Sequence, residues 1–164
     1  MRDAQRGSAD ALERLFRAHW PRAHRAALLV VGDAAAAEDI AQESFLAAVR
    51  SLDSFDRKRP FGPWLHRIVV NRAIDFTRAR RLRREIDLER VAEPAGPERD
   101  LDSRADEIAV ALSSLGPEQR AVIVLRYLLE YTPGEIAELL GLPRGTVNSR
   151  LRRGLDRLEE GLEP

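Results

Sequence analysis

The sequence predicts an all-α fold, with two small helical domains joined by an acidic linker. Apolar residues recur three and four positions apart almost everywhere outside the predicted loops, which is the period of an amphipathic helix. Alternating runs of β-branched residues, which are typical of strands, are absent. Residues 86–104 contain prolines and a glycine among many acids, so they are typical of a linker. We therefore place the domains at residues 1–85 and 105–164.

Local signals divide the start of the first domain into three helices. Ser8 can cap the first helix, and Pro21 can open the second, because proline fits the first turn of a helix. Gly32 can end the second helix, and Asp33 can cap a third over about 34–50. The third helix is expected to stack four apolar residues on one side: Ala41, Phe45, Ala48 and Val49. Its polar side carries Asp39, Gln42, Glu43 and Arg50.

A longer helix is expected over about 62–83, after a loop at 51–60. Residues spaced by four, three and four share one face of this helix: Arg67, Asn71, Ile74 and Arg78, with Arg81 at the edge. The residues expected to anchor its other sides in the core are Trp64, Leu65, Ile68, Val69 and Phe76. The preceding loop adds Phe55, Arg57, Lys58 and Arg59, which combine an aromatic ring with cationic groups suited to a single strand. Core packing is the alternative explanation for Phe55, and the favoured one for Trp64.

The second domain is predicted to end in a helix-turn-helix, after helices at 108–115 and 117–129. Thr132 can cap a helix while Glu135 reaches back to the amide of the cap. Gly141 suits the left-handed residue that ends this helix, and Pro143 fixes the start of the next one. Ala137 and Gly141 are small residues, and we expect them to lie where the two helices cross closely. This pattern is typical of proteins that bind nucleic acid, and an ordinary solvated helix rich in arginine is the less favoured alternative.

The last helix separates its apolar and polar residues. The residues expected on its buried side are Val147, Leu151, Gly154, Leu155 and Leu158. Residues near the start of such a helix enter the major groove, so base reading is assigned to Arg144, Thr146, Asn148 and Ser149. Contacts to the DNA backbone are assigned to Arg150, Arg152 and Arg153.

Composition excludes several classes of function. The net charge is zero, but residues 57–84 contain ten basic residues against one acid, and residues 85–107 contain nine acids against three arginines. With no cysteine and three scattered histidines, a disulfide framework or a metal site is not expected, and no cofactor is. No nucleophile with a base and no phosphate loop is found, so we expect a protein that is not an enzyme. With no signal peptide or membrane span, we expect a cytoplasmic protein that does not insert into membranes.

Three segments, taken in order, resemble the extracytoplasmic-function sigma factors, a compact class of bacterial transcription initiation factors. Residues 37–46, AEDIAQESFL, resemble the polymerase-binding segment of that family. Residues 61–65, FGPWL, with Asn71, Asp75 and the basic run 78–84, resemble its segment for the minus-ten promoter element. The third segment is LGPEQR at 115–120 with the helix-turn-helix, which resembles the domain for the minus-thirty-five element. The resemblance covers nearly the whole chain.

The resemblance implies a role for each group of residues. The residues implied to bind core RNA polymerase, at the coiled coil of its largest subunit, are Asp39, Gln42, Glu43 and Leu46. Those implied for the minus-ten element, as duplex and as melted non-template strand, are Phe55, Arg57, Lys58, Arg59, Arg67, Asn71, Arg78 and Arg81. The last helix would contact the minus-thirty-five element. The flap region of polymerase and an anti-sigma factor are further implied partners, and bound polymerase would hold the chain at the nucleoid.

Two other functions remain open at this point. A dimeric helix-turn-helix regulator acting without polymerase would need a palindromic site and no contribution from residues 34–84. A helical adaptor that binds only proteins would tolerate the loss of the arginines of the last helix. Leu129 and Tyr131, if exposed, would mark a partner surface, although packing is the more common explanation. Asn148 stands where many members of the family carry a basic residue, which suggests a changed base preference.

Overall fold

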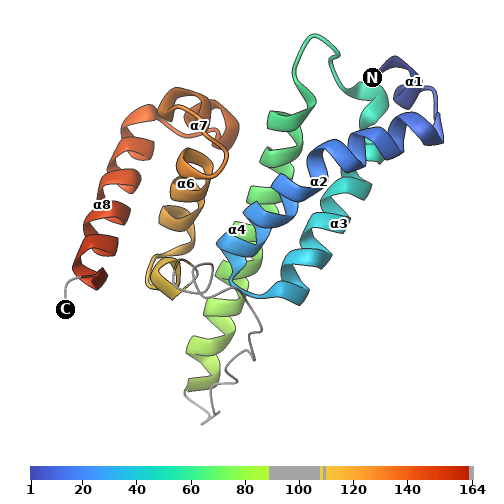
Figure 1. Cartoon of the computed structure of the whole chain (residues 1–164). Helices are drawn as coiled ribbons and strands as arrows, with labels where there is room; N and C mark the ends of the chain where they lie inside the picture. Colours follow the sequence, from blue (N-terminus) through green and yellow to red (C-terminus); the bar gives the residue numbers. More distant parts are fainter. Residues whose placement is uncertain (89–107, 109, 163–164) are drawn as a thin grey trace.

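The computed structural model describes residues 1–88, 108 and 110–162, and this part of the chain is helical, with no strand. The predicted all-α fold is therefore confirmed. Figure 1 shows the arrangement of the helices. The elements are α1 (Arg2–Gln5), α2 (Ala9–Val31), α3 (Ala34–Arg50), a short 3₁₀ turn η1 (Leu52–Ser54), α4 (Phe61–Leu88), α6 (Pro117–Tyr127), α7 (Pro133–Leu140) and α8 (Arg144–Leu162). Residues 110–113 are also helical.

The predicted break at Pro21 is wrong, because α2 runs through this residue without interruption. The Ser8 hydroxyl caps the helix by accepting from the amide of Ala11, and Gly32 ends it at a φ of 72°. A proline inside a helix removes one hydrogen bond and costs about 3 kcal/mol. Here Pro21 and Arg17, four positions before it, are both exposed, so the proline lies on the solvent side of α2. The other side of α2 is buried in the core, which offsets this cost.

The core of the first half lies between α2, α3 and α4, and small residues allow these helices to approach closely. Fully buried residues of this core include Ala23, Ala27, Ala41, Leu65 and Val69. Two predicted core residues are not in the core. Val49 is 42% exposed and Phe76 is 38% exposed, because each lies at the edge of its helix, beyond the apolar stripe that faces the neighbours.

Helix α4 is longer than predicted, since it continues to Leu88. Three residues of the predicted linker, 86–88, are therefore helical, and the rest of it, 89–104, lies outside the described residues. The helix continues because arginines, leucine and glutamate are all good helix formers. An ion pair between Arg81 and Glu85, four positions apart and 3.0 Å in length, adds support on its surface.

The two predicted domains pack against each other along one continuous core. Helix α6 lies against both α2 and α4, and α7 also contacts α4. Figure 1 shows α6 beside α4. Buried residues of α6 that join this core include Ala121, Val122 and Leu125. The faces of α2 and α4 that lie against α6 and α7 are thus covered by the second half.

Candidate nucleic-acid and polymerase interfaces

The helix-turn-helix is formed as its local signals indicate. The amide of Glu135 donates to the Thr132 hydroxyl at 3.3 Å, and the Thr132 amide donates to the Glu135 carboxylate at 2.7 Å. The hydrogen bonds from Thr132 lower the pKa of Glu135, which keeps this carboxylate charged at the positive end of α7. Gly141 ends α7 at a φ of 66°. The turn thus directs α8 away from α7 at a fixed angle.

One of the predicted roles of the glycines in this half is wrong, and two are confirmed. Gly141 is exposed, and a Cβ atom there would meet nothing within 4 Å, so its predicted role in a close helix crossing is wrong. Its positive φ is what requires glycine. Close approach occurs instead at Gly154 of α8, where a Cβ atom would lie 3.2 Å from Ile123 Cγ1 of α6. Gly154 is buried, as predicted for its side of the helix.

Helix α8 presents its polar side to solvent. Val147 and Leu151 are buried on its inner side, with Leu155 and Leu158 partly buried beside them. The predicted base-reading and backbone-binding residues lie outside this stripe. Exposed members are Arg144, Asn148, Ser149, Arg152 and Arg153, whereas Thr146 and Arg150 are half-buried. Arg150 and Arg153 also line a cleft together with arginines of α4, so these two residues lie on the side of α8 toward the first half.

The face of α4 assigned to the minus-ten element is partly covered by the second half. Arg67 is exposed, Asn71 is half-buried and Ile74 is buried. Arg78 Nε donates to the Glu118 carboxylate of α6 at 2.6 Å. Partial burial raises the pKa of Glu118, but the hydrogen bond and charge of Arg78 outweigh this effect and lower it overall. In this arrangement Arg78 is engaged by protein, and Arg81 is paired with Glu85 on its own helix.

In the loop before α4, the aromatic residue is buried, whereas the cationic residues are exposed. Arg57, Lys58 and Arg59 are exposed. Phe55 is 7% exposed and packs on Trp64, with ring centroids 4.7 Å apart, while its carbonyl accepts a hydrogen bond from Gln5. The ring is therefore in the core in this structure, and its use as a stacking surface for a base stays a prediction.

The polar side of α3 is exposed, as an interface with another protein requires. Asp39, Gln42 and Glu43 all face solvent, and Leu46 beside them is 55% exposed. Gln42 donates to Glu38 at 3.2 Å, and Glu43 accepts from Arg72 of α4 at 2.9 Å. The four residues assigned to polymerase binding thus lie on one accessible surface that includes an apolar side chain.

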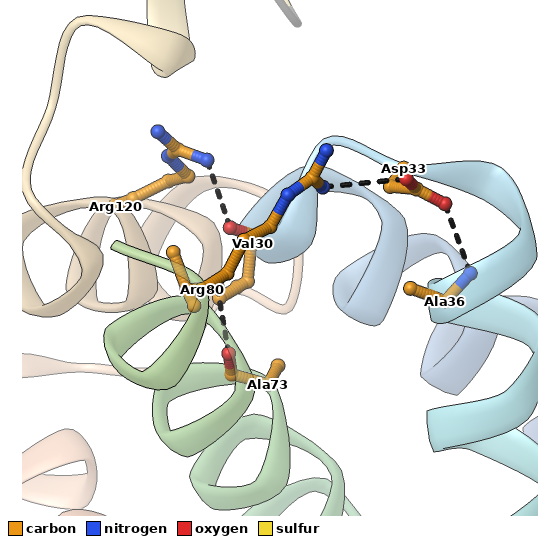
Figure 2. A network of polar contacts seen from close by, with 7 residues as sticks. Val30, Asp33, Ala36, Ala73, Arg80 and Arg120 are labelled. Atoms are coloured by element: carbon orange, nitrogen blue, oxygen red, sulfur yellow. Dashed lines mark hydrogen bonds and ion pairs between the residues drawn. The ribbon is translucent and has the colours of Figure 1, made fainter. Parts of the chain in front are cut away.

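The contact between the halves is built around polar residues that sequence reasoning missed. Arg120 of α6 is 7% exposed, and its Nη1 atom donates to the carbonyl oxygen of Val30 at 2.9 Å. Figure 2 shows Arg120 and Arg80 both reaching toward the turn between α2 and α3, where Arg80 pairs with Asp33 at 3.3 Å. Arg120 precedes the apolar run AVIVL, but this local pattern does not indicate an acceptor in a distant helix.

A second polar contact joins α4 to the segment before α7. His66 Nδ1 and the Tyr131 hydroxyl lie 2.7 Å apart. Burial lowers the pKa of His66 to about 4, with smaller contributions from His19 and Arg22. Burial likewise raises the pKa of Tyr131 to about 12. Leu129 is buried and Tyr131 is half-buried, so packing, and not an exposed partner surface, explains both residues.

Other kinds of site are not found in the described ranges. No group of three or more His, Asp or Glu residues there could hold a metal ion. No described helix is both long enough and apolar enough to cross a membrane.

The described residues provide an accessible cationic helix on a helix-turn-helix, next to a helical half with basic and acidic surfaces. This fold and these surfaces define a two-part DNA-binding protein.

Comparison with known proteins identifies the family. Residues 15–83 match the model of sigma-70 region 2, and residues 105–158 match that of sigma-70 region 4. The chain is 32% identical to the ECF RNA polymerase sigma factor SigW of Bacillus subtilis, over 99% of this chain and 94% of SigW. It is 39% identical to SigE of Mycolicibacterium smegmatis, over 92% of this chain and 61% of SigE.

Solved structures agree with this family. The structure of CnrH in complex with the cytosolic domain of CnrY matches with a TM-score of 0.73 and 29% identity, and it covers 98% of this chain and 92% of CnrH. The chain belongs to the extracytoplasmic-function sigma factors of the sigma-70 family. It directs RNA polymerase to promoters, and a regulator that acts without polymerase is not favoured. Sigma factors are initiation factors without an enzymatic activity of their own.

Proposed function

We propose that this sigma factor divides its work among three surfaces. The surface of α3 formed by Asp39, Gln42, Glu43 and Leu46 binds the coiled coil of the largest polymerase subunit. The observation that carries this assignment is the exposure of Leu46, an apolar side chain, within a polar patch. Exposed apolar groups rimmed by polar residues are typical of protein interfaces.

The second surface binds the minus-ten element. The exposed cations of the loop before α4 and of α4 itself hold the melted non-template strand: Arg57, Lys58, Arg59, Arg67, Arg78 and Arg81, with Asn71 among them. Phe55 can stack on a base only after it leaves the aromatic cluster. The cost of unpairing a base, a few kcal/mol, is offset by contacts with the strand.

The third surface is the outer side of α8, which binds the minus-thirty-five element.

Because Arg78 is paired with Glu118 and α6 covers part of α4, this structure is a closed form. Promoter binding requires the halves to separate, and polymerase supplies the binding energy for this step. Because CnrH is known in complex with the cytosolic domain of CnrY, we include an anti-sigma factor among the partners and the cytoplasm as the place of action.

Run-off transcription with purified bacterial core polymerase tests this function. Promoter fragments from the chain's own genomic neighbourhood should give specific start sites only when the chain is present. A variant with Asp39→Lys and Glu43→Lys should lose association with polymerase in a pull-down, whereas Asp53→Lys, an exposed acid on η1, should not. Unchanged association of the α3 variant would remove that surface from the interface. Absence of both transcripts and core binding would contradict the proposal as a whole.

A further inference from the structure

The loop before α4 is attached to the core at two of its residues. Within residues 51–60, Leu52 and Phe55 are buried, whereas residues 56–60 are all exposed. The η1 turn begins at Leu52 and ends at Phe55, whose amide donates to the Leu52 carbonyl at 3.1 Å. The three cations at 57–59 therefore follow directly after the second point of attachment.

One side chain from another element binds the backbone at both points. Gln5 of α1 donates from Nε2 to the Leu52 carbonyl at 2.9 Å and to the Phe55 carbonyl at 3.0 Å. A side-chain amide nitrogen carries two hydrogens, so one group can serve both carbonyls. The bonded residues are 47 and 50 positions apart in the sequence, so no local pattern indicates this contact. We call these two hydrogen bonds the Gln5 bracket.

Helix α1 is packed in a way that holds the bracket in place. Ala4 is buried, and Met1 packs partly buried against the core. Gly7 has a φ of 82°, which allows a sharp turn between α1 and α2, and the Ser8 amide donates to the Asp3 carbonyl at 2.9 Å. Helix α1 contacts both η1 and α2, and Figure 1 shows it at the same end of the molecule as the loop. The bracket thus comes from a packed element.

Beyond the bracket, the loop forms a turn of its own. The Asp56 carboxylate accepts from the Lys58 amide at 3.0 Å, and the Asp56 carbonyl accepts from the Arg59 amide at 2.9 Å. These two bonds lie within the turn and do not join it to another element. Because Asp56 directly follows Phe55, a movement of the Phe55 backbone would move the turn and its cations. The position of the cations therefore depends on the bracket.

We propose that Gln5 is a positioning residue for strand capture, because its bracket fixes η1 and so presents the cations of the loop to the melted non-template strand in one arrangement. The inference rests on the proposed minus-ten function and adds to it a residue that makes no contact with DNA. A site that is ordered before its ligand arrives loses less conformational freedom on binding. If only a fraction of the molecules holds the binding arrangement, the apparent affinity falls by that fraction.

Hydrogen exchange of the full chain tests the bracket without DNA. Gln5→Met keeps an unbranched side chain of similar length and removes both donors. The amides of residues 51–60 should exchange at least about fivefold faster in this variant, because the loop opens locally more often when these bonds are lost. Gln5→Lys retains N–H donors and should restore part of the protection. Arg6→Met, at the exposed neighbouring residue, should leave the exchange of the loop unchanged.

Holoenzyme made from the full chain and core polymerase tests the consequence for DNA. One probe is a labelled single strand with the non-template minus-ten sequence of a promoter found by run-off transcription. The other is a labelled duplex with the minus-thirty-five sequence of the same promoter. Gln5→Met should bind the single strand about three- to tenfold more weakly and the duplex as the parent does. A general loss of folding would weaken both.

A stability control separates positioning from folding. Ile136→Val removes one methyl group from a buried side chain of α7, in the second half, and lowers stability through lost packing. It should leave the affinity for the minus-ten single strand unchanged. Equal weakening of single-strand binding by Gln5→Met and Ile136→Val, with both folded by circular dichroism, would reduce the role of Gln5 to general stability and overturn the proposal.

Two further results would also overturn it. Unchanged exchange of residues 51–60 in Gln5→Met would show that the bracket does not fix the loop. Faster exchange with unchanged affinity for the single strand would show that the order of the loop does not serve strand binding.

A separate variant tests the minus-ten surface itself. Lys58→Gln, Arg59→Gln removes two exposed cations of the loop and should weaken binding of the single strand. Unchanged binding in this variant would remove the loop from the minus-ten surface, and the role of Gln5 in strand capture with it. The exchange experiment would still show whether the bracket orders the loop, so a failure of the proposed function and a failure of the bracket can be told apart.

Discussion

Arg120 and Val30 lie 90 positions apart in the sequence, yet the Arg120 Nη1 atom is 2.9 Å from the Val30 carbonyl oxygen. The same side chain donates from Nη2 to the carbonyls of Ser113 and Leu115, at 3.0 and 3.1 Å. One buried guanidinium therefore ties the end of α2 to the segment that leads into α6. The two halves are held by this directed contact as well as by their shared apolar core.

Replacing Arg120 should destabilise the whole protein. Arg120→Met leaves three carbonyl oxygens without their donor, and unpaired buried polar groups cost roughly 1–3 kcal/mol each before relaxation. We expect a loss of about 2–4 kcal/mol, which lowers Tm by about 5–15 °C in a chain of this size. Thermal unfolding followed by circular dichroism measures it. Arg14→Met, at an exposed site, should shift Tm by less than about 2 °C.

The buried His66 should make stability depend on pH. Its pKa is about 4 in the folded state and 6.5 when unfolded, so the unfolded chain binds the additional proton. The free energy of unfolding is highest above pH 6.5, where His66 is neutral in both states. It decreases as the pH falls from 6.5 toward 4, by about 3 kcal/mol at most, because only the unfolded chain takes up the proton in this range. Urea unfolding at pH 4.5, 5.5 and 7.5 measures this loss. His66→Gln should flatten the dependence in this window. His24→Gln, which removes a half-buried ring stacked on Trp20, serves as the control, and an unchanged slope in the His66 variant would contradict the assignment.

Loss of the Arg78–Glu118 pair should favour the open form. Glu118→Gln weakens the ion pair that engages Arg78 from the second half, and a partly exposed pair contributes less than about 1 kcal/mol. We expect a two- to fivefold gain, roughly, in affinity for a labelled single strand of the minus-ten region. Fluorescence anisotropy measures this affinity. Glu13→Gln, which breaks an exposed pair with Arg17 inside α2, should leave it unchanged.

Two exposed residues of α8 should affect promoter binding in different ways. Asn148→Ala should change the preference at one upstream base by about 1–3 kcal/mol, because it removes a contact to a base edge. Arg152→Ala should weaken binding to all promoters and reduce the salt dependence by about one unit of slope. Competition assays with holoenzyme and promoters varied in the minus-thirty-five region, at several salt concentrations, distinguish the two. Identical base preference in the Asn148 variant would place that residue outside base reading.

Local signals predicted the helices better than they predicted how the helices meet. Thr132 with Glu135, Ser8 and Asp33 all cap the helices that their neighbours in sequence indicate, because capping depends only on adjacent residues. Pro21 misled the prediction because packing of α2 outweighs a local preference. The covering of Ile74 and the pairing of Arg78 could not be predicted, since both depend on where α6 lies relative to α4. Which side chains contact DNA or polymerase stays a prediction.

The order of the elements along the chain has a consequence for synthesis. Helices α2, α3 and α4 are consecutive and contact one another extensively, so we expect this half to begin folding before the second half is synthesised. Until Arg120 has been synthesised, the Val30 carbonyl at the end of α2 lacks the donor that it has in the complete protein. We therefore expect the second half to fold against a surface that the first half has already formed, and a nascent chain stalled between the two would expose the apolar surface that α6 covers in the complete protein.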